Sequence, residues 1–455
     1  MPLAIKNTYV GDQAVIAADA KLSGNGGEVI VWADNYTRFD GTITARGFNG
    51  GFVETSGKNI LHVGDSARVN VGANGGQAGT WLLDPLNIQI GAVADANVTT
   101  VSPFTPTASP SRLSNVTLNN ALSTGNVVIQ TTGTVGNEPG DVTFLGNASV
   151  TWSTGSNLTV NAYRSIVVQE NAVINATGAG SITFNSSLGN GNPPAGNYIG
   201  IHIQGQIFSN TGDITLNGRG GNGTLNNNYG VFINGHRPSA ITPTNAIIQS
   251  NSGNITINGI GGDSSSGGNH YGVYINGGAR IQNTSGNITI TGIAPSNGAN
   301  SDGVFITTNP RGNDSGSNSS LENTTFGQQT TITNVNGNIQ ITGVANGTGA
   351  TNDGIAHWNA LVQTTGSGNI TYHGTSGTGT APSKDGLEFQ RYGLGSQSAE
   401  IKATGSGNIF LTGVLRGGNA TDNAIKFGED PPRTEYIVMH LLLSLTLAIS
   451  ASVQS

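Results

Sequence analysis

A recurring set of aspartates is the strongest candidate for a metal site in this sequence. Each stands just before a short apolar segment, and they are Asp302, Asp353, Asp385 and Asp422. If those segments stack as strands, the carboxylates would form a column with a spacing of about 5 Å. Carboxylate oxygens suit Ca²⁺. Asp-Gly is also a turn dipeptide in which the Asp side chain bonds nearby backbone. Tyr229 and Tyr271 occupy the same place in earlier segments, which favours the turn interpretation.

Asparagines form a second recurring series, each between a glycine and an apolar residue. They are Asn254, Asn287, Asn338, Asn369 and Asn408. At 254, 287 and 369 the pattern Asn-x-Thr could accept an N-linked glycan in a suitable host. Asn also tolerates left-handed turns and can form ladders between stacked strands. We prefer this structural interpretation.

The four tryptophans offer an alternative, carbohydrate-binding chemistry. Trp32, Trp81, Trp152 and Trp358 could present flat rings on which sugars stack. Large aromatic side chains more often lie in a core, where they bury much apolar area. We therefore expect these residues to be structural.

No other arrangement of residues predicts chemistry. The chain has seven scattered His and no Cys, and it lacks a His-Glu-x-x-His, Walker or Gly-x-Ser-x-Gly motif. The regular Asp of nonapeptide calcium repeats is missing as well. We predict no catalytic, cofactor-binding or metal-binding residue, and therefore no enzyme.

The elements that would position these residues are repeats in the second half of the chain. A Gly-Asn or Gly-Asp step followed by alternating apolar residues begins at Gly212, Gly253, Gly286, Gly337, Gly368 and Gly407, with a spacing of 31 to 51 residues. Each period also contains a second segment such as Tyr271–Ile275 and a third such as Ala279–Gln282. One period thus predicts three short strands.

This repeat predicts an all-β solenoid. Apolar residues at i and i+2 direct one face of each strand inward. Three such short strands cannot bury their apolar face alone, so they must stack on the next copy. Equivalent strands have the same sense one period apart, which predicts parallel pairing and a parallel β-helix with loops of variable length.

Composition narrows the function classes. The chain has 455 residues, of which 70 are Gly and only 9% are charged, and its formal net charge is −7. The glycines follow no collagen period, and the low charge argues against a coiled coil or a typical disordered chain. No basic cluster is available for nucleic acid or an anionic membrane.

The sequence divides into five parts. Residues 1–90 and 113–196 predict β-helical segments, 91–112 a Pro/Ser/Thr-rich loop, and 197–428 the repeats. Residues 429–455 lack Gly and Asn and form an anomalous tail, for which a disrupted reading frame is favoured over a capping helix. Its apolar run at 437–449 is too short for a membrane span. The amino terminus has no cationic start followed by an apolar core, so no secretory signal peptide is visible and we expect a fragment.

Four blocks resemble the filamentous haemagglutinin-like exoproteins of bacterial two-partner secretion. They are Gly26–Asp34, Thr37–Ile43, Gly50–Lys58 and the Gly-Thr-Trp-Leu-Leu-Asp-Pro sequence Gly79–Pro85. Leu158–Arg164 resembles the region that follows in that family. The resemblance implies a right-handed β-helix, secretion through an outer-membrane β-barrel transporter, and adhesion at the cell surface to a glycan or protein receptor. Within this resemblance we expect the chain to be a fragment without the family's amino-terminal secretion domain.

Three functions are therefore compared. The preferred one is a structural, adhesive segment of a secreted or surface-exposed exoprotein, without catalysis. The alternative is a polysaccharide-active or carbohydrate-binding β-helix, although enzymes of this kind need paired carboxylates and the acidic residues are scattered. An ice-binding solenoid would need Thr in regular ranks, and the variable repeat spacing argues against such ranks.

Overall fold

The computed structural model is nearly all-β, with 47% of residues in strands and 2% in a helix. It describes residues 5–92, 110–133, 138–187, 193–235, 246–263, 267–308, 328–392, 398–416, 418–430 and 447–454. The chain divides into two compact units, one with residues 1–191 and 207–212, and the other with residues 192–206 and 213–455. Each unit is a parallel β-helix, as the repeat predicts.

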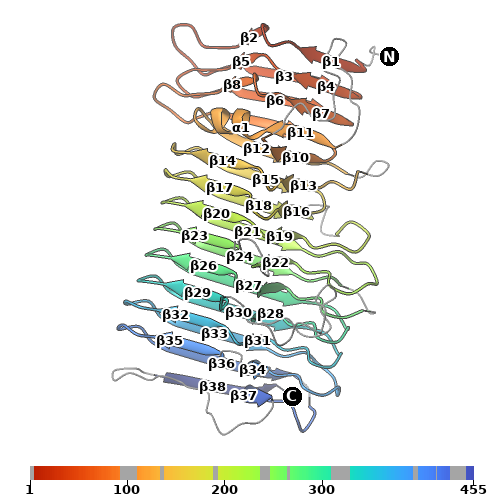
Figure 1. Ribbon diagram of the computed structural model, residues 1–455, viewed down its shortest axis with the longest axis vertical. Helices are drawn as coiled ribbons and strands as arrows, with labels where there is room; N and C mark the ends of the chain where they lie inside the picture. The colour runs from red at the N-terminus through yellow and green to blue at the C-terminus, as the bar shows by residue number, and fades with distance from the viewer. Residues whose placement is uncertain are drawn as a thin grey trace. The chain divides into compact units, whose positions relative to one another are not determined.

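In unit 1, strands from successive coils form parallel sheets (Figure 1). Sheet 1 has the order β1 (Asn7–Val10), β4 (Tyr36–Phe39), β7 (Ile60–Val63), β11 (Ser111–Ser114), β10 (Ile88–Gly91), β13 (Val142–Phe144) and β16 (Ile166–Val168). Sheet 2 has β3 (Glu28–Ala33), β6 (Phe52–Gly57), β9 (Thr80–Asp84), β12 (Asn126–Gln130), β15 (Leu158–Ala162) and β18 (Ile182–Ser186). Sheet 3 is in two parts, β2 (Val15–Ala17), β5 (Thr42–Thr44) and β8 (Arg68–Asn70), then β14 (Ser149–Trp152), β17 (Val173–Ala176) and β20 (Gln206–Ser209).

Unit 2 repeats the same three-sheet pattern. Its sheet 1 has β19 (Ile201–Ile203), β22 (Val231–Asn234), β25 (Val273–Asn276), β28 (Val304–Thr307), β31 (Ile355–Trp358), β34 (Leu387–Tyr392) and β37 (Ile425–Asp430). Its sheet 2 has β21 (Ile214–Arg219), β24 (Ile255–Ile260), β27 (Ile288–Ala294), β30 (Ile339–Ala345), β33 (Ile370–Thr375), β36 (Ile409–Arg416) and β38 (Leu447–Gln454). Its sheet 3 has β23 (Ile247–Ser250), β26 (Arg280–Asn283), β29 (Thr331–Asn334), β32 (Leu361–Thr364) and β35 (Glu400–Ala403).

The core of unit 2 follows from the alternation of apolar and polar residues. Ile255 pairs with Ile288, and Ile288 with Ile339, so identical side chains stack in columns. These three isoleucines are completely buried, whereas the threonines that follow Ile255 and Ile288 face outward and are half-buried. Stacking one coil on the next therefore supplies the apolar burial that a single coil cannot provide.

Unit 1 contains one helix where the sequence predicted only strands. Helix α1 (Asn115–Leu122) follows β11, and the Ser114 side chain caps it by accepting a hydrogen bond from the Val116 N–H. The helix contacts β8 and β14, so it occupies the sheet-3 position in its coil. The chain enters this coil through β11, which lies between β7 and β10. An additional strand and a helix are thus built into the stack without interrupting the parallel sheet.

The variation in repeat spacing falls almost entirely at one corner of unit 2. We call the connection from sheet 1 to sheet 3 the variable corner, and its extremes are residues 308–330 and residues 359–360. The connection from sheet 2 to sheet 1, which we call the fixed corner, has ten to twelve residues between paired positions such as Gly292 and Gly303. Because the insertions leave at a single corner, the strands keep their register.

Glycine sets the geometry of the fixed corner. A Cβ built on Gly343 would lie 2.0 Å from the carbonyl oxygen of Gly354, and the same clash recurs between Gly292 and Gly303 at 1.9 Å. No side chain fits where two backbones approach so closely. Gly292 and Gly343, which lie two residues before the ends of β27 and β30, therefore allow the close approach to the turn that precedes the next sheet-1 strand.

Some predicted parts lie outside the described residues. These are residues 93–109 of the Pro/Ser/Thr-rich segment and residues 431–446 of the anomalous tail. Within that tail, residues 447–454 form β38, which pairs in parallel with β36. Among the residues that the structure describes, no helix is long and apolar enough to cross a membrane.

Candidate functional site

The aspartate column lies at the fixed corner, where sheet 1 of unit 2 begins. Asp302, Asp353 and Asp385 each stand two residues before a sheet-1 strand and are at most 1% exposed. Asp302 Oδ1 accepts a hydrogen bond from the Asp353 N–H at 3.0 Å, and Asp353 Oδ1 accepts one from the Asp385 N–H at 2.7 Å. Each carboxylate is thus bonded to the backbone of the following coil.

Asp422, the fourth predicted member, does not belong to this column. Ile425 pairs with Leu387, so the residue equivalent to Asp385 is Asn423. The Asn423 N–H donates to Asp385 Oδ1 at 2.7 Å, as the column requires. Asp422 lies one position earlier and accepts a hydrogen bond from the Lys384 N–H at 3.1 Å. The prediction was wrong here because the corner contains Asp-Asn-Ala instead of Asp-Gly.

The contacts of the column support the structural interpretation of these aspartates. Carboxylate oxygens that already accept backbone N–H groups stabilise the turn to the next coil. No group of three or more His, Asp or Glu within the described ranges is arranged to hold a metal ion. Asn423 occupies the equivalent place in the coil after Asp385, where its N–H and its side-chain amide both donate to Asp385 Oδ1.

A second polar column runs beside the first in the opposite direction. The Asn228 N–H donates to His270 Nδ1 at 3.3 Å, the His270 N–H to Ser301 Oγ at 3.2 Å, and the Ser301 N–H to Asn352 Oδ1 at 2.9 Å. In this column the later coil supplies the acceptor, whereas in the aspartate column the earlier coil does. All four residues are buried, so the two columns together bond the backbone of the corner.

The asparagine series forms the ladder that the sequence predicted. The N–H of Asn287 donates to Asn254 Oδ1 at 3.0 Å, that of Asn338 to Asn287 Oδ1 at 3.0 Å, and that of Asn369 to Asn338 Oδ1 at 2.9 Å. Asn408 continues the series at 2.8 Å from Asn369 Oδ1. The amide oxygens of Asn254, Asn287, Asn338 and Asn369 are therefore used between coils, which supports the structural interpretation.

A buried charged cluster in unit 2 was not found from the sequence. Lys426 Nζ lies 2.7 Å from Glu388 Oε1 and 3.3 Å from Asp385 Oδ2. Trp358 Nε1 donates to Glu388 Oε2 at 2.8 Å. Aligning Gly386-Leu387-Glu388 with Ala424-Ile425-Lys426 would have placed Glu388 beside Lys426, because both follow the first apolar residue of their strands.

The environment of this cluster shifts its pKa values. Burial raises the pKa of Asp385, and the Lys426 charge only partly opposes this effect. Burial alone would lower the pKa of Lys426, but the charges and hydrogen bonds of Glu388 and Asp385 outweigh burial and raise that pKa. Both carboxylates contact the same ammonium and are almost fully buried. Two buried carboxylates thus share the partly exposed ammonium of Lys426, and loss of that ammonium would leave them without their charge partner.

Another polar pair lies inside the core of unit 2. The Tyr372 hydroxyl is 3.0 Å from His357 Nδ1, and His357 Nε2 is 2.9 Å from the carbonyl oxygen of Ala360. A carbonyl only accepts, so Nε2 carries the proton and Nδ1 accepts from tyrosine. Burial lowers the pKa of His357 to about 4. This histidine is neutral and fully bonded, as expected for a core residue.

Three of the four tryptophans lie inside the structure. Trp81, Trp152 and Trp358 are at most 7% exposed, whereas Trp32 on β3 is 42% exposed. The core prediction is confirmed for the first three and is wrong for Trp32, whose side chain points outward from its strand.

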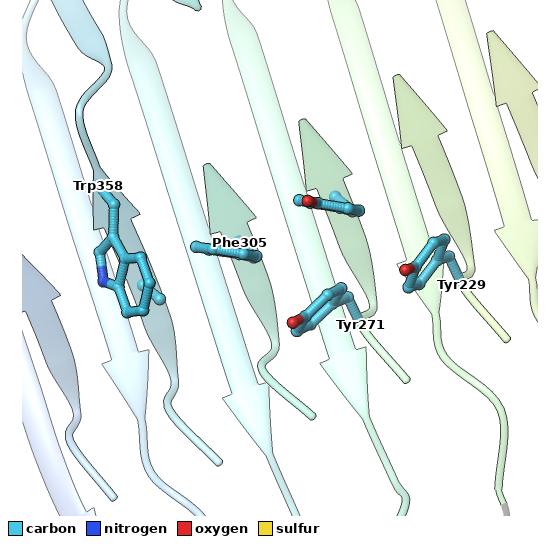
Figure 2. Packing of buried hydrophobic residues seen from close by; sticks show 6 residues of the cluster. Tyr229, Tyr271, Phe305 and Trp358 are labelled. Carbon is cyan, nitrogen blue, oxygen red and sulfur yellow. The ribbon is translucent and has the colours of Figure 1, made fainter. Parts of the chain in front are cut away.

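A buried aromatic cluster covers part of sheet 1 of unit 2 (Figure 2). Tyr229 and Tyr271 stack with ring centroids 5.4 Å apart, and Trp358 meets Phe305 edge-on at 5.2 Å. Tyr274 and Phe305 are parallel at 5.2 Å, and both are at most 1% exposed. Rings this deeply buried are part of the packing and offer no platform for a sugar.

Comparison with known proteins identifies no family for this chain. No protein-family model matches the chain, and no curated protein matches it. The structure itself establishes a parallel β-helix in which the buried polar columns, charged cluster and aromatic rings hold successive coils together.

Proposed function

We propose that this chain is a structural, adhesive segment of a bacterial secreted or surface-exposed β-helix exoprotein. In this role the stacked coils form a stable support, and the insertions between strands contact other cells or surfaces. The proposal includes no catalysis. Functional residues commonly lie on loops that a rigid scaffold positions.

The confinement of insertions to the variable corner carries the proposal. The longest one is held at its base, because the Thr330 N–H donates to Thr308 Oγ1 at 3.0 Å and Thr330 Oγ1 donates to the Thr307 carbonyl at 2.8 Å. Residues 309–329 can therefore vary without moving β28 or β29. A fold that presents variable segments at one edge suits recognition of diverse surfaces.

The resemblance of residues 26–90 to filamentous haemagglutinin-like exoproteins supports the same proposal. Those residues form β3, β6 and β9 with their connections, which lie in a parallel β-helix of the kind that this resemblance implies. On this basis we propose export through an outer-membrane β-barrel transporter and a location at the bacterial surface. The receptor would be a glycan or protein on the opposing surface.

Bead adhesion tests this function. Beads coated with the full chain should be retained on bacterial or animal cell layers more strongly than beads coated with an inert protein. A variant in which residues 309–327 are replaced by a short Gly-Ser linker should lose part of this retention. A matched variant, Thr331→Ser on β29, should retain it. Equal retention of chain-coated and inert beads would show that the adhesive proposal is wrong.

Carbohydrate binding is a second candidate because of Trp32. This indole is 42% exposed on β3, two residues from Ile30, which is 56% exposed, so an outward apolar surface is available. Sugar rings stack on such surfaces. Glycan-array binding that disappears in Trp32→Ala and persists in Trp81→Phe would favour this candidate. Release of reducing ends from polysaccharides by the wild-type chain would instead indicate a polysaccharide-active enzyme.

A further inference from the structure

The outward face of sheet 2 in unit 2 carries two regular polar columns. We call these residues of β24, β27, β30 and β33 the hydroxyl-amide face, and they point away from the buried isoleucine columns. One column is Thr256, Thr289, Gln340 and Thr371, and the other is Asn258, Thr291, Thr342 and His373. All eight side chains are at least partly exposed.

The residues of the two columns pair in regular register across the strands, although the repeats differ in length. Thr256 pairs directly with Thr289, and Thr289 with Gln340, although 33 and 51 residues separate them along the chain. The extra residues leave at the variable corner, and glycine holds the fixed corner at constant geometry. The sequence argument against regular ranks was therefore wrong, because the spacing along the chain does not set the spacing across this sheet.

The two columns define a lattice. Neighbouring strands of a sheet lie about 4.8 Å apart, and residues i and i+2 of one strand about 6.6 Å apart. Hydroxyl and amide groups therefore recur in two dimensions at these distances over four strands. Water oxygens on the faces of hexagonal ice recur at a spacing close to that between strands and at a longer spacing somewhat above that between residues i and i+2.

The face itself carries no Asp, Glu, Lys or Arg side chain, and neither do the flanking columns at 254, 287, 338, 369 and at 260, 293, 344, 375. Ile260, Ile293 and Val344 place an aliphatic column beside the hydroxyls. Thr offers a hydroxyl and a methyl group together, so the face presents hydrogen-bonding and apolar groups in the same ranks.

From this pattern we infer that the hydroxyl-amide face of unit 2 binds ice. Its ranked hydroxyl and amide groups would hydrogen-bond to ordered water, while the methyl groups would favour water in a cage-like arrangement. The face contains no tryptophan or tyrosine on which sugar rings could stack, so crystalline polysaccharide is the weaker candidate. The inference is independent of the proposed adhesive function, since it concerns a different surface.

Ice partitioning tests the inference. An ice shell is grown slowly from a dilute solution of the full chain, and the protein recovered in the ice is compared with that left in solution. The double variant Thr289→Lys/Thr291→Lys places two charges in the centre of the face. We expect its ice-bound fraction to fall about tenfold, equivalent to about 1.4 kcal/mol in partition free energy. Freezing hysteresis should fall in parallel.

The matched control is Thr331→Lys/Thr333→Lys on β29, where two outward threonines lie on sheet 3. This variant carries the same charge and should enter ice like the wild type, and circular dichroism with thermal melting confirms that both variants fold.

Exclusion of the wild-type chain from ice overturns the inference. Equal losses in the two variants also overturn it, as does binding to crystalline cellulose or chitin without ice uptake. Ice uptake without cell adhesion would support it and contradict only the adhesive proposal.

Discussion

The two corners of unit 2 connect successive strands in opposite ways, since one is tightly packed and the other accepts insertions. At the fixed corner, Gly343 and Gly354 bring two backbones together, and buried side-chain columns bond each coil to the next. At the variable corner, the connection is two residues long after β31 and 23 residues long after β28. The comparison teaches that a solenoid keeps its register if one corner is held rigidly, because the other corner is then free to accept insertions.

The largest effect is expected from a side chain at the fixed corner. In Gly343→Val the new Cβ would lie 2.0 Å from a backbone oxygen that cannot move without displacing β31. We expect a loss well above about 4 kcal/mol, a range that single substitutions rarely reach. Denaturant unfolding followed by circular dichroism measures it. Gly418→Ala is the control, because no atom lies within 4 Å of its added Cβ. A stability change as small as that of the control would contradict the proposed role of glycine.

A smaller effect is expected from the aspartate column. Asp353→Ala removes the acceptor of the buried Asp385 N–H, and an unsatisfied buried group costs about 1–3 kcal/mol. Asp353→Asn keeps an amide oxygen at this place that can accept the same hydrogen bond. It should therefore retain nearly full stability in the same unfolding experiment. Equal destabilisation by both variants would show that the charge matters and not the hydrogen bond.

The shortest version of the variable corner should be sensitive to acid. His357 reaches across residues 359–360 to the Ala360 carbonyl, and burial lowers its pKa to about 4. The unfolded side chain has a pKa near 6.5. Between these values the unfolded chain binds more protons, so stability rises with pH and is lost as pH falls from about 6.5 to about 4.

Removing the histidine should remove that dependence. His357→Phe combined with Tyr372→Phe leaves no unpaired partner and should reduce the slope of unfolding free energy by up to about 1.4 kcal/mol per pH unit in this window. His202, whose pKa burial also lowers to about 4, contributes to the slope that remains, and Asp84, whose pKa burial raises to about 6, opposes it. Unfolding of the wild type and of the double variant, measured at a series of pH values, separates the contribution of His357 from that of the other groups. An unchanged slope in the double variant would exclude His357 as its source.

The smallest effect is expected where the variable corner is longest. Thr308 and Thr330 are already hydrogen-bonded at the base of the insertion, so replacing residues 309–327 with a short linker should leave the strands in place. Loop closure changes only slowly with length, and we expect a stability change below about 1 kcal/mol. Thermal melting of the deletion variant measures it. A large loss would show that the insertion is part of the support.

The sequence predicted the fold well because its main determinant is local. The alternation of apolar and polar residues after each Gly-Asn step indicates which side of a strand is buried. The repeat indicates which strand of the next coil that strand pairs with. The asparagine ladder followed from the same alignment. Helix α1 was missed because Asn115–Leu122 has a weak amphipathic pattern, and only the cap at Ser114 distinguishes it from a turn.

What the sequence did not predict depends on register between distant coils. Asp422 was placed one residue away from its true position, since the Asp-Gly pattern ends with Asp385. The Glu388–Lys426 pair required the alignment of strands 38 residues apart, and the hydroxyl-amide face required knowing which corner absorbs the insertions. None of these is visible in the local residue pattern, although all of them follow once the strands are paired.

The directions of the hydrogen bonds in the asparagine ladder have a consequence for assembly. Asn338 accepts from Asn369, which comes later in the chain, so in this ladder each folded coil presents an amide oxygen to the segment that follows it. A chain that emerges gradually with its amino terminus first would meet a prepared template at every step. Growth in that order completes the asparagine ladder one coil at a time, whereas the column of His270, Ser301 and Asn352, whose acceptors lie in the later coil, closes only when the next coil has been added.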